Sequence, residues 1–250
     1  MKNYDHFITQ IQSVNSEFQA LLDDEENDRY VITDGALHPE HYYQLLVKED
    51  KPRIMWLMKE PYDDENGTGG GWDFYEGFFK ETPSFYQRLV KGGSRATWQP
   101  VVYVSYSVMN GYPSFDDMDY IRDNPAMADA LNHIAWVNLH KLPAYGMTRS
   151  DYGRIIELYK KSKDLLQKQV EMLRPNIIIC GGTFPIIRYD LEGVKLVKFG
   201  SVNYYVWKNV LYIDAYHPAQ TQIERAEYCD DIIMLCKAFT KNPNLINYPQ

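Results

Sequence analysis

Four short runs of apolar residues stand out along the chain because they lack the spacing of a helix face. Such continuous runs, bounded by proline, glycine or polar residues, are typical of strands that are buried on both faces of a sheet. They cover residues 53–58, 135–139, 176–180 and 210–214. We therefore predict four central β-strands at these positions.

Three longer segments have the pattern of amphipathic helices. These helices are expected over residues 5–24, 150–173 and from 218 to about 241. Ser150 or Asp151 can cap the start of the second helix, and Pro175 follows its end. Pro218 fits the first turn of the third helix, where a missing backbone N–H is tolerated.

Buried strands that alternate with helices predict an α/β protein, with a central four-stranded parallel sheet in a three-layer α/β/α arrangement. No internal repeat, low-complexity tract or linker divides the 250 residues, so we expect a single domain over residues 1–250. Residues 1–50 are expected to be a helical, acidic extension packed on it. A chain of this length can bury roughly 70% of its unfolded surface, which is sufficient for a substantial core.

Composition excludes several classes of protein. Hydrophobic residues make up 45% of the chain, but no apolar run approaches the roughly 20 residues that span a bilayer, so no membrane partner is expected. The first residues lack the apolar core of a secretory signal, which favours the cytoplasm. An odd number of cysteines (Cys180, Cys229 and Cys236) without a Cys-x-x-Cys spacing predicts buried, reduced thiols. Neither a disulfide nor a metal site is expected.

The net charge of −8 argues against a nucleic-acid partner, because phosphate binding needs a cationic face. The acidity is concentrated in residues 1–65, which hold 15 acidic and six basic residues. The rest of the chain is close to neutral and can present a local basic face. The lysines and arginines of residues 149–168 cover more than one face of their predicted helix, which is typical of a solvated surface.

Familiar catalytic and nucleotide-binding motifs are absent. The glycine-rich residues 67–72 lack both the last glycine of a dinucleotide-binding loop and a following Lys-Ser/Thr, so they predict a flexible loop or lid. No Gly-x-Ser-x-Gly elbow occurs. His133 and His140 do not form a His-Glu-x-x-His motif and are interpreted as structural histidines.

The residues that directly follow the four predicted strands are the candidates for a site, since ligands of parallel sheets bind beyond the carboxyl ends of the strands. Lys59–Asp64 follow the first strand and Asn138 ends the second. Gly181 and Gly182 follow the third strand, and His217 with its neighbours follows the fourth. A carboxylate, an amide, a glycine turn and an imidazole are thus expected to converge on one crevice.

In this order the motifs resemble those of the uracil-DNA glycosylase superfamily, over roughly residues 53–225. Met58-Lys59-Glu60-Pro61-Tyr62 takes the place of the family's Gly-Gln-Asp-Pro-Tyr after the first strand. Asn138 takes the place of the family's asparagine after the second strand, and His217-Pro218-Ala219 that of its His-Pro-Ser motif. The resemblance implies a hydrolase that cleaves the N-glycosidic bond of a uracil or damaged base in DNA, without a cofactor.

The resemblance also implies a role for each matching residue. Glu60 is the expected catalytic carboxylate, which orients water and offsets the charge that develops on the sugar, and His217 hydrogen-bonds the departing base. Asn138 is expected to read the Watson–Crick edge of the base, whose flipping into the pocket exposes that edge. The expected substrate-binding residues are Tyr62, Trp72, Phe74, Asn138, Gly181, Gly182 and Pro218.

Aromatic residues near the glycine-rich loop supply the expected contacts to the base. Tyr62 corresponds to the ring that guards the pocket in the family. Phe74, or else Trp72, corresponds to the ring that stacks on the base, since both follow the loop closely. Most other aromatic residues of this stretch are expected in the core.

Departures from the family pattern keep two alternatives open. Met58 replaces a glycine, Glu60 is one methylene longer than the usual Asp, and Ala219–Gln222 lacks the family's Ser-Pro-Leu-Ser motif, which wedges into the duplex. A catalytically inactive protein of the same fold that binds nucleobases or nucleic acid is one alternative. An N-glycosidase of free nucleosides or nucleotides is the other. The expected partner is accordingly DNA or a nucleobase-containing small molecule, and a monomer is favoured.

Overall fold

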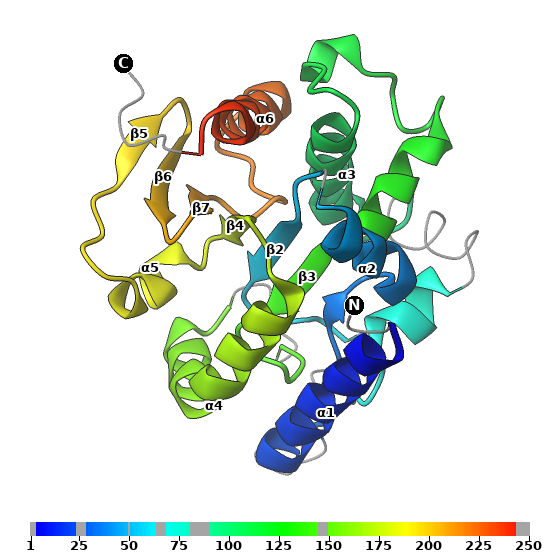
Figure 1. The fold of residues 1–250 in the computed structure, drawn as a ribbon, viewed down its shortest axis with the longest axis vertical. Helices are drawn as coiled ribbons and strands as arrows, with labels where there is room; N and C mark the ends of the chain where they lie inside the picture. The colour runs from blue at the N-terminus through cyan, green and yellow to red at the C-terminus, as the bar shows by residue number, and fades with distance from the viewer. Residues whose placement is uncertain are drawn as a thin grey trace.

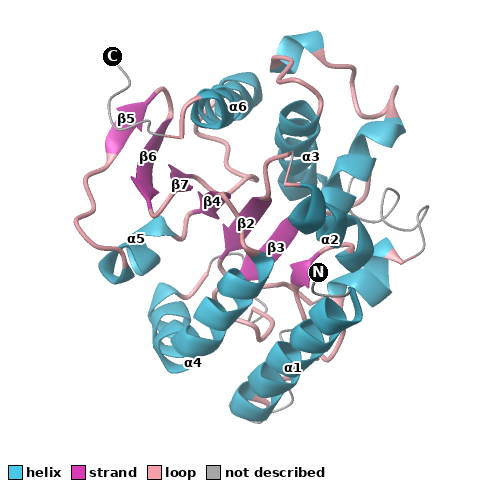
Figure 2. Ribbon diagram, in the orientation of Figure 1, coloured by secondary structure: helices cyan, strands magenta, loops and turns pink. Residues whose placement is uncertain are grey.

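The protein is built on one mixed β-sheet with helices on both of its faces (Figure 1). A computed structural model describes residues 4–23, 29–49, 51–63, 69–80, 91–144 and 150–243. The strands are β1 (Gly35–Ala36), β2 (Ile54–Met58), β3 (Ala135–Asn138), β4 (Ile177–Gly181), β5 (Val197–Phe199), β6 (Val202–Trp207) and β7 (Val210–Ala215). They form a seven-stranded sheet in the order β1-β3-β2-β4-β7-β6-β5 (Figure 2).

The α/β class predicted from the sequence is confirmed, but the sheet is larger than expected and is not all parallel. Strand β2 pairs in parallel with β3 and β4, and β4 pairs in parallel with β7. Three additional strands pair antiparallel, β1 with β3, β6 with β7 and β5 with β6. The added strands give weak sequence signals because β1 has only two residues and β5 and β6 are partly exposed.

A tight turn joins β6 to β7 and explains why this hairpin is hard to recognise in the sequence. Lys208 and Asn209 form the two-residue connection, with φ values of 49° and 61°. A turn with positive φ at both central residues matches the right-handed twist of a hairpin, and Asn-Gly or Asp-Gly is its usual sequence. A lysine in the first position conceals that signal.

The helices form a layer on each side of the sheet. They are α1 (Tyr4–Leu22), α2 (Pro39–Lys48), α3 (Arg95–Met109), α4 (Tyr152–Leu173), α5 (Phe184–Ile187) and α6 (Arg225–Lys241), with short turns η1 (Tyr75–Phe79), η3 (Phe115–Asp117), η4 (Pro125–His133) and η5 (Arg188–Asp190). Helices α1 and α4 cover one face, and α3 and α6 cover the other (Figure 1). Side chains of β2 alternate between the two cores, with Trp56 packed towards α3 and α6 and Leu57 towards α1 and α4.

Two of the three predicted helices are confirmed. Helix α1 matches residues 5–24, and α4 begins after Asp151, whose carboxylate accepts the backbone N–H of Arg154 at 3.1 Å. The prediction for the third helix was wrong at its start, since α6 begins at Arg225. Pro218 lies instead in a turn that the N–H of Gln220 closes on the carbonyl of His217 at 2.9 Å.

The N-terminal segment is part of the sheet as well as a helical cover. Helix α1 packs on α4, and α2 packs beside α1 and η4. Between them, β1 extends the sheet at the edge of β3. All three cysteines are buried and free, as predicted. Among the described residues, no helix is both long enough and apolar enough to cross a lipid bilayer.

Candidate functional site

The order of the strands puts the point where the chain connections diverge between the carboxyl ends of β2 and β4. The chain leaves β2 towards β3 on one side, and it leaves β4 towards β7 on the other. In open α/β sheets the ligand lies where the connections diverge in this way. Lys59 and Glu60 follow β2 at this point, and Gly182 follows β4.

Glu60 has a partly desolvated carboxylate. Burial raises the pKa of the Glu60 carboxyl, while a hydrogen bond with Ser150 and the charge of Lys59 lower it in part. Its Oε2 is buried without a hydrogen-bond partner among the described residues. The adjacent Pro61 carbonyl accepts the N–H of Ala144 at 2.8 Å, which holds the loop against the segment after β3. Glu60 is therefore a largely desolvated carboxylate with one buried oxygen that no described residue hydrogen-bonds.

His217 is held as a neutral ring with a defined tautomer. Burial and the nearby charge of Lys59 lower the pKa of His217 to about 4. Nδ1 accepts the backbone N–H of Ala219 at 3.2 Å, so the proton of the neutral ring resides on Nε2. No described residue accepts a hydrogen bond from Nε2. His217 can therefore donate a hydrogen bond to a ligand at neutral pH.

Lys59 acts electrostatically on both catalytic candidates, although no role was predicted for it from the sequence. Its Nζ lies 4.9 Å from the ring centre of Tyr152, and its charge acts on both Glu60 and His217. A Cβ added to Gly182 would lie 3.5 Å from Lys59 Cε and 4.0 Å from the backbone nitrogen of His217. Lys59, Gly182 and the backbone of His217 thus lie close together, and Glu60 directly follows Lys59 in the chain.

Gly182 has a backbone conformation that glycine adopts much more readily than other residues. Its φ of +77° is in the left-handed region, and its N–H bonds to the carbonyl of Ala215 at 2.8 Å. The hydroxyl of Tyr152 reaches the Gly182 carbonyl at 3.5 Å. These bonds fix the end of β4 to the end of β7 and to the start of α4.

Gly181 and Pro218 are near this group but are covered by Met58. A Cβ on Gly181 would lie 2.6 Å from the Met58 sulfur and 3.4 Å from Pro218 Cδ. Met58 is only 2% exposed. Its side chain therefore lies across Gly181 and fills the space beside Pro218. The packing of Met58 by itself is sufficient reason for a glycine at position 181.

Asn138 is bound into a buried polar network rather than left open. It is 1% exposed, and Asp34 Oδ2 accepts both its backbone N–H at 2.7 Å and its Nδ2 at 3.0 Å. A carboxylate can only accept, so Nδ2 must point at Asp34 and Oδ1 must point away. One Nδ2 hydrogen and Oδ1 remain for another partner.

Asp34, which the sequence analysis did not single out, is the centre of that network. Its Oδ1 forms an ion pair with Lys141 Nζ at 2.5 Å, and the side chains are 0% and 2% exposed. Gln169 accepts from Lys141 at 2.9 Å and donates to the Asp34 carbonyl at 3.0 Å. Burial lowers the pKa of the Lys141 ammonium, and Asp34 opposes that effect. The network therefore connects the N-terminal segment, β3 and α4.

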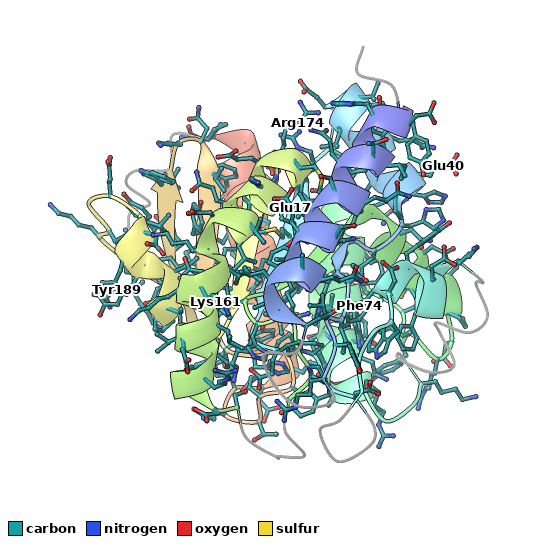
Figure 3. All side chains as sticks on the ribbon, turned by 90° about the horizontal axis from the view of Figure 1, so that it is seen from below. Glu17, Glu40, Phe74, Lys161, Arg174 and Tyr189 are labelled. Carbon is teal, nitrogen blue, oxygen red and sulfur yellow. The ribbon has the colours of Figure 1, made fainter. Side chains whose placement is uncertain are left out.

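The aromatic candidates have different environments. Phe74 is 7% exposed and packs within 6.5 Å of Trp136 between ring centres, so it belongs to the core (Figure 3). Trp72 is half-buried, packs edge-on against Phe74, and donates from Nε1 to Asp63 at 3.1 Å. Tyr62 is 55% exposed. Partial burial raises the pKa of the Tyr62 phenol, and the charge of Glu60 raises it further. Of the predicted loop or lid, residues 67 and 68 lie outside the described residues.

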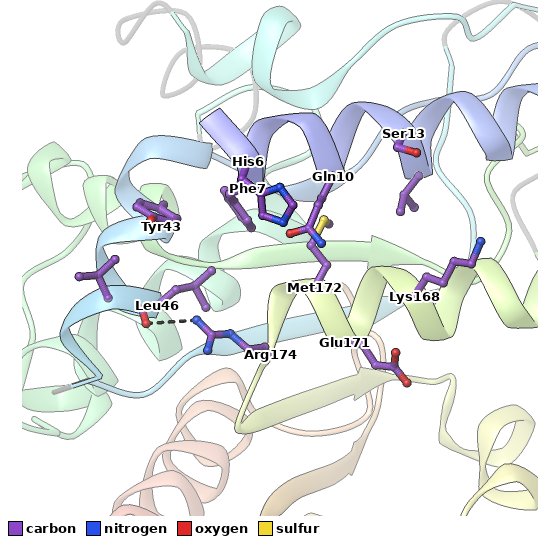
Figure 4. Close-up of a pocket in the computed structure, with 12 residues that line it drawn as sticks. His6, Phe7, Gln10, Ser13, Tyr43, Leu46, Lys168, Glu171, Met172 and Arg174 are labelled. Atoms are coloured by element: carbon purple, nitrogen blue, oxygen red, sulfur yellow. Dashed lines mark hydrogen bonds between the residues drawn. The ribbon is translucent and has the colours of Figure 1, made fainter. Parts of the chain in front are cut away.

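A separate hollow of about 630 Å³ lies between α1, α2 and α4 (Figure 4). Its lining comes from α1, α2 and the last turns of α4, together with Arg174 at the C-cap of α4, whose Nη2 donates to the Leu46 carbonyl at 3.2 Å. Tyr152 of the candidate site is at the opposite end of this 22-residue helix, about 30 Å away. No residue predicted for the site lines this hollow.

The sequence matches no protein-family model, and no curated protein is significantly similar to it. We therefore infer a function from the chemistry of the residues around Lys59 and Gly182.

Proposed function

We propose that the protein hydrolyses the N-glycosidic bond of a uracil or another base in DNA, with Glu60 and His217 as its catalytic residues. The observations that carry the proposal are a buried carboxylate directly after β2 and a neutral imidazole after β7, each of which is affected by the charge of Lys59. Both side chains have an atom without a partner among the described residues, Oε2 of Glu60 and Nε2 of His217.

Each group has a distinct part in the reaction. A water held by Glu60 adds to the sugar C1′ and passes a proton to the Glu60 carboxylate, while the bond between C1′ and the base nitrogen breaks. The base leaves with the electron pair of that bond, and the carboxylate stabilises the positive charge of the oxocarbenium-like transition state. Nε2–H of His217 donates to the base oxygen on which negative charge grows.

Lys59 favours the protonation states that these roles require, a neutral His217 and an ionised Glu60. Its ammonium disfavours protonation of His217, so the ring acts as a neutral hydrogen-bond donor. The same charge favours the ionised form of Glu60, which the proposed role requires. Burial alone would raise the pKa of that carboxyl further.

The arrangement of the strands supports the resemblance to the uracil-DNA glycosylase superfamily. Strands β3, β2, β4 and β7 pair in parallel with one another in that order, and we take them as the equivalent of the superfamily's four-stranded sheet. The remaining strands are then additions at its two edges.

The test uses uracil-containing oligonucleotides, single- and double-stranded, with abasic sites detected by strand cleavage in alkali. Glu60→Gln and His217→Ala should each slow product formation by about 100-fold or more. Glu227→Gln and His6→Ala, which change exposed residues of the same types, should leave the rate unchanged. Absence of product, or product that persists in Glu60→Gln and His217→Ala, would refute the proposal. Mononucleosides in a parallel assay distinguish an N-glycosidase of free nucleosides.

Met58 favours a second candidate function, a protein that binds a nucleobase or nucleic acid without cleaving it. Its side chain occupies the space over Gly181 where the superfamily has only a glycine backbone. Under this proposal the wild type binds the oligonucleotide and releases no base. Turnover by the wild type would reject it, whereas turnover that appears only in Met58→Gly would support it.

A further inference from the structure

A second groove leads away from the candidate site along α4. This hollow of about 450 Å³ lies between α4 and the segment formed by α5 and η5, and Ile156, Lys160 and Tyr189 contribute to its walls. Both walls start at the site. Tyr152 precedes Ile156 by one helical turn and contacts Gly182, which is followed almost directly by α5.

Tyr189 lines this groove, and Tyr152 lies one helical turn before its lining residue Ile156; both tyrosines are exposed and have a cation over the ring. Tyr189 is 81% exposed, and the Arg188 guanidinium lies 5.2 Å from its ring centre. Tyr152 is 45% exposed, with Lys59 Nζ at 4.9 Å from its ring centre. An aromatic ring with a neighbouring cation is a favourable platform for a nucleobase, since the base stacks on the ring and the cation is close to the phosphate.

The wall that carries Tyr189 is anchored to α4. The Tyr159 hydroxyl and the Lys163 ammonium both bond to the Asp190 carboxylate, which holds η5 against the helix. Lys160 and Lys161 are exposed on the outer side of α4, and Figure 3 shows Lys161 on this helix with Tyr189 at the neighbouring edge of the molecule. The platform therefore has a fixed position relative to the cations around it.

We infer that this groove binds the single strand of nucleic acid that carries the target nucleotide, an inference that rests on the proposed function. Bases in a duplex stack on each other, so only unpaired bases can lie on Tyr189 and Tyr152. Charge complementarity supports a polyanion, because Lys160 lines the groove, the Lys163 ammonium offsets the Asp190 carboxylate in its wall, and Arg188 lies 5.2 Å from the ring centre of Tyr189. Tyr152 and Lys163 are about 16 Å apart along the helix, which leaves room for several nucleotides.

The experiment measures the fluorescence anisotropy of a labelled oligothymidylate at salt concentrations between about 50 and 200 mM. With about three phosphate contacts, log K should fall with log salt with a slope of about −2. Tyr189→Ala should weaken binding about tenfold, as expected for the loss of one stacked base. Lys160→Glu should weaken binding and reduce the slope by about 0.7.

Matched controls separate the groove from other surfaces. Tyr120 is 62% exposed with Arg122 at 4.9 Å from its ring centre, so Tyr120→Ala removes a similar ring elsewhere. Lys241→Glu makes the same charge change at the end of α6. Neither control should change binding. Polyglutamate should not compete, and the matching duplex should bind at least tenfold more weakly.

The inference is overturned if the wild type does not bind the oligonucleotide, or if Tyr189→Ala and Tyr120→Ala lose the same affinity for it. It is also overturned if the duplex or polyglutamate binds as tightly as the single strand. Groove-dependent binding without base release would reject the proposed function alone. Base release from the oligonucleotide with Tyr189→Ala and Lys160→Glu binding like the wild type would reject the groove alone.

Discussion

The buried ion pair of Asp34 and Lys141 permits a sharp test of the architecture around Asn138. Asp34→Asn leaves the Lys141 ammonium buried with Gln169 as its remaining partner, and removal of one partner from a buried pair costs about 3–5 kcal/mol. Lys141→Met leaves the Asp34 carboxylate buried but still bonded to Asn138 and Gln169, so its cost should be at the lower end of that range.

The double variant should recover much of the loss. An Asn at position 34 keeps an oxygen for the two donors of Asn138, and its amide can donate to Gln169 Oε1 in place of the Lys141 ammonium. Combined with Lys141→Met it removes both charges at similar volume, which is often close to neutral. We therefore expect a coupling free energy of about 2–3 kcal/mol in the double-mutant cycle.

The assay is urea unfolding followed by tryptophan fluorescence and by far-ultraviolet circular dichroism, with coincident transitions as the test of two-state behaviour. The surface pair of Lys168 and Glu17 provides the control. Its side chains are 54% and 41% exposed at a separation of 2.6 Å, so the same cycle there should give at most about 1 kcal/mol. A single Asp34→Asn variant as stable as the wild type, or a double variant as unstable as the worse single, would refute the reasoning.

Four further predictions concern the site and its supports. Gly181→Ala should destabilise by about 1–3 kcal/mol in the same unfolding assay, and Met58→Ala should restore much of that loss by freeing the space. His217 is neutral in the folded protein down to a pKa of about 4 but titrates near 6.5 when unfolded, so stability should fall as pH drops from 6.5 towards 4. NMR titration should show a higher His217 pKa in Lys59→Met, and an unchanged value would contradict the role given to that lysine. Asp151→Ala removes the N-cap of α4 and should lower the free energy of unfolding by about 1 kcal/mol, measured as a shift of the urea midpoint.

The parts of the fold that the sequence predicted are those with a strong local signal. Strands β2, β3, β4 and β7 are continuous apolar runs, and α1 and α4 have a clear polar face. Helix α3 was missed because it is buried on nearly all sides and therefore lacks the periodicity of an amphipathic helix. The start of α6 was misplaced because Pro218 is equally compatible with a helix turn and with the turn that Gln220 closes.

The site was predictable only where it follows directly from strand ends. Lys59, Gly182 and His217 lie close together because the carboxyl ends of parallel strands are neighbours, and Glu60 follows Lys59. Tyr152 was not predictable in this way, since its place at the site depends on how α4 packs across the sheet. Asp34 reaches Asn138 across 104 residues of sequence, and no local pattern encodes such a contact.

The two ends of the sheet have a consequence for how the protein behaves in a crowded solution. The outermost strands, β1 and β5, have two and three residues. An unpaired strand edge is a template for backbone pairing with a second molecule, and its hazard grows with its length. Edges this short offer a neighbouring chain only a few free amide and carbonyl groups. The short edge strands therefore disfavour association of two molecules through their sheets.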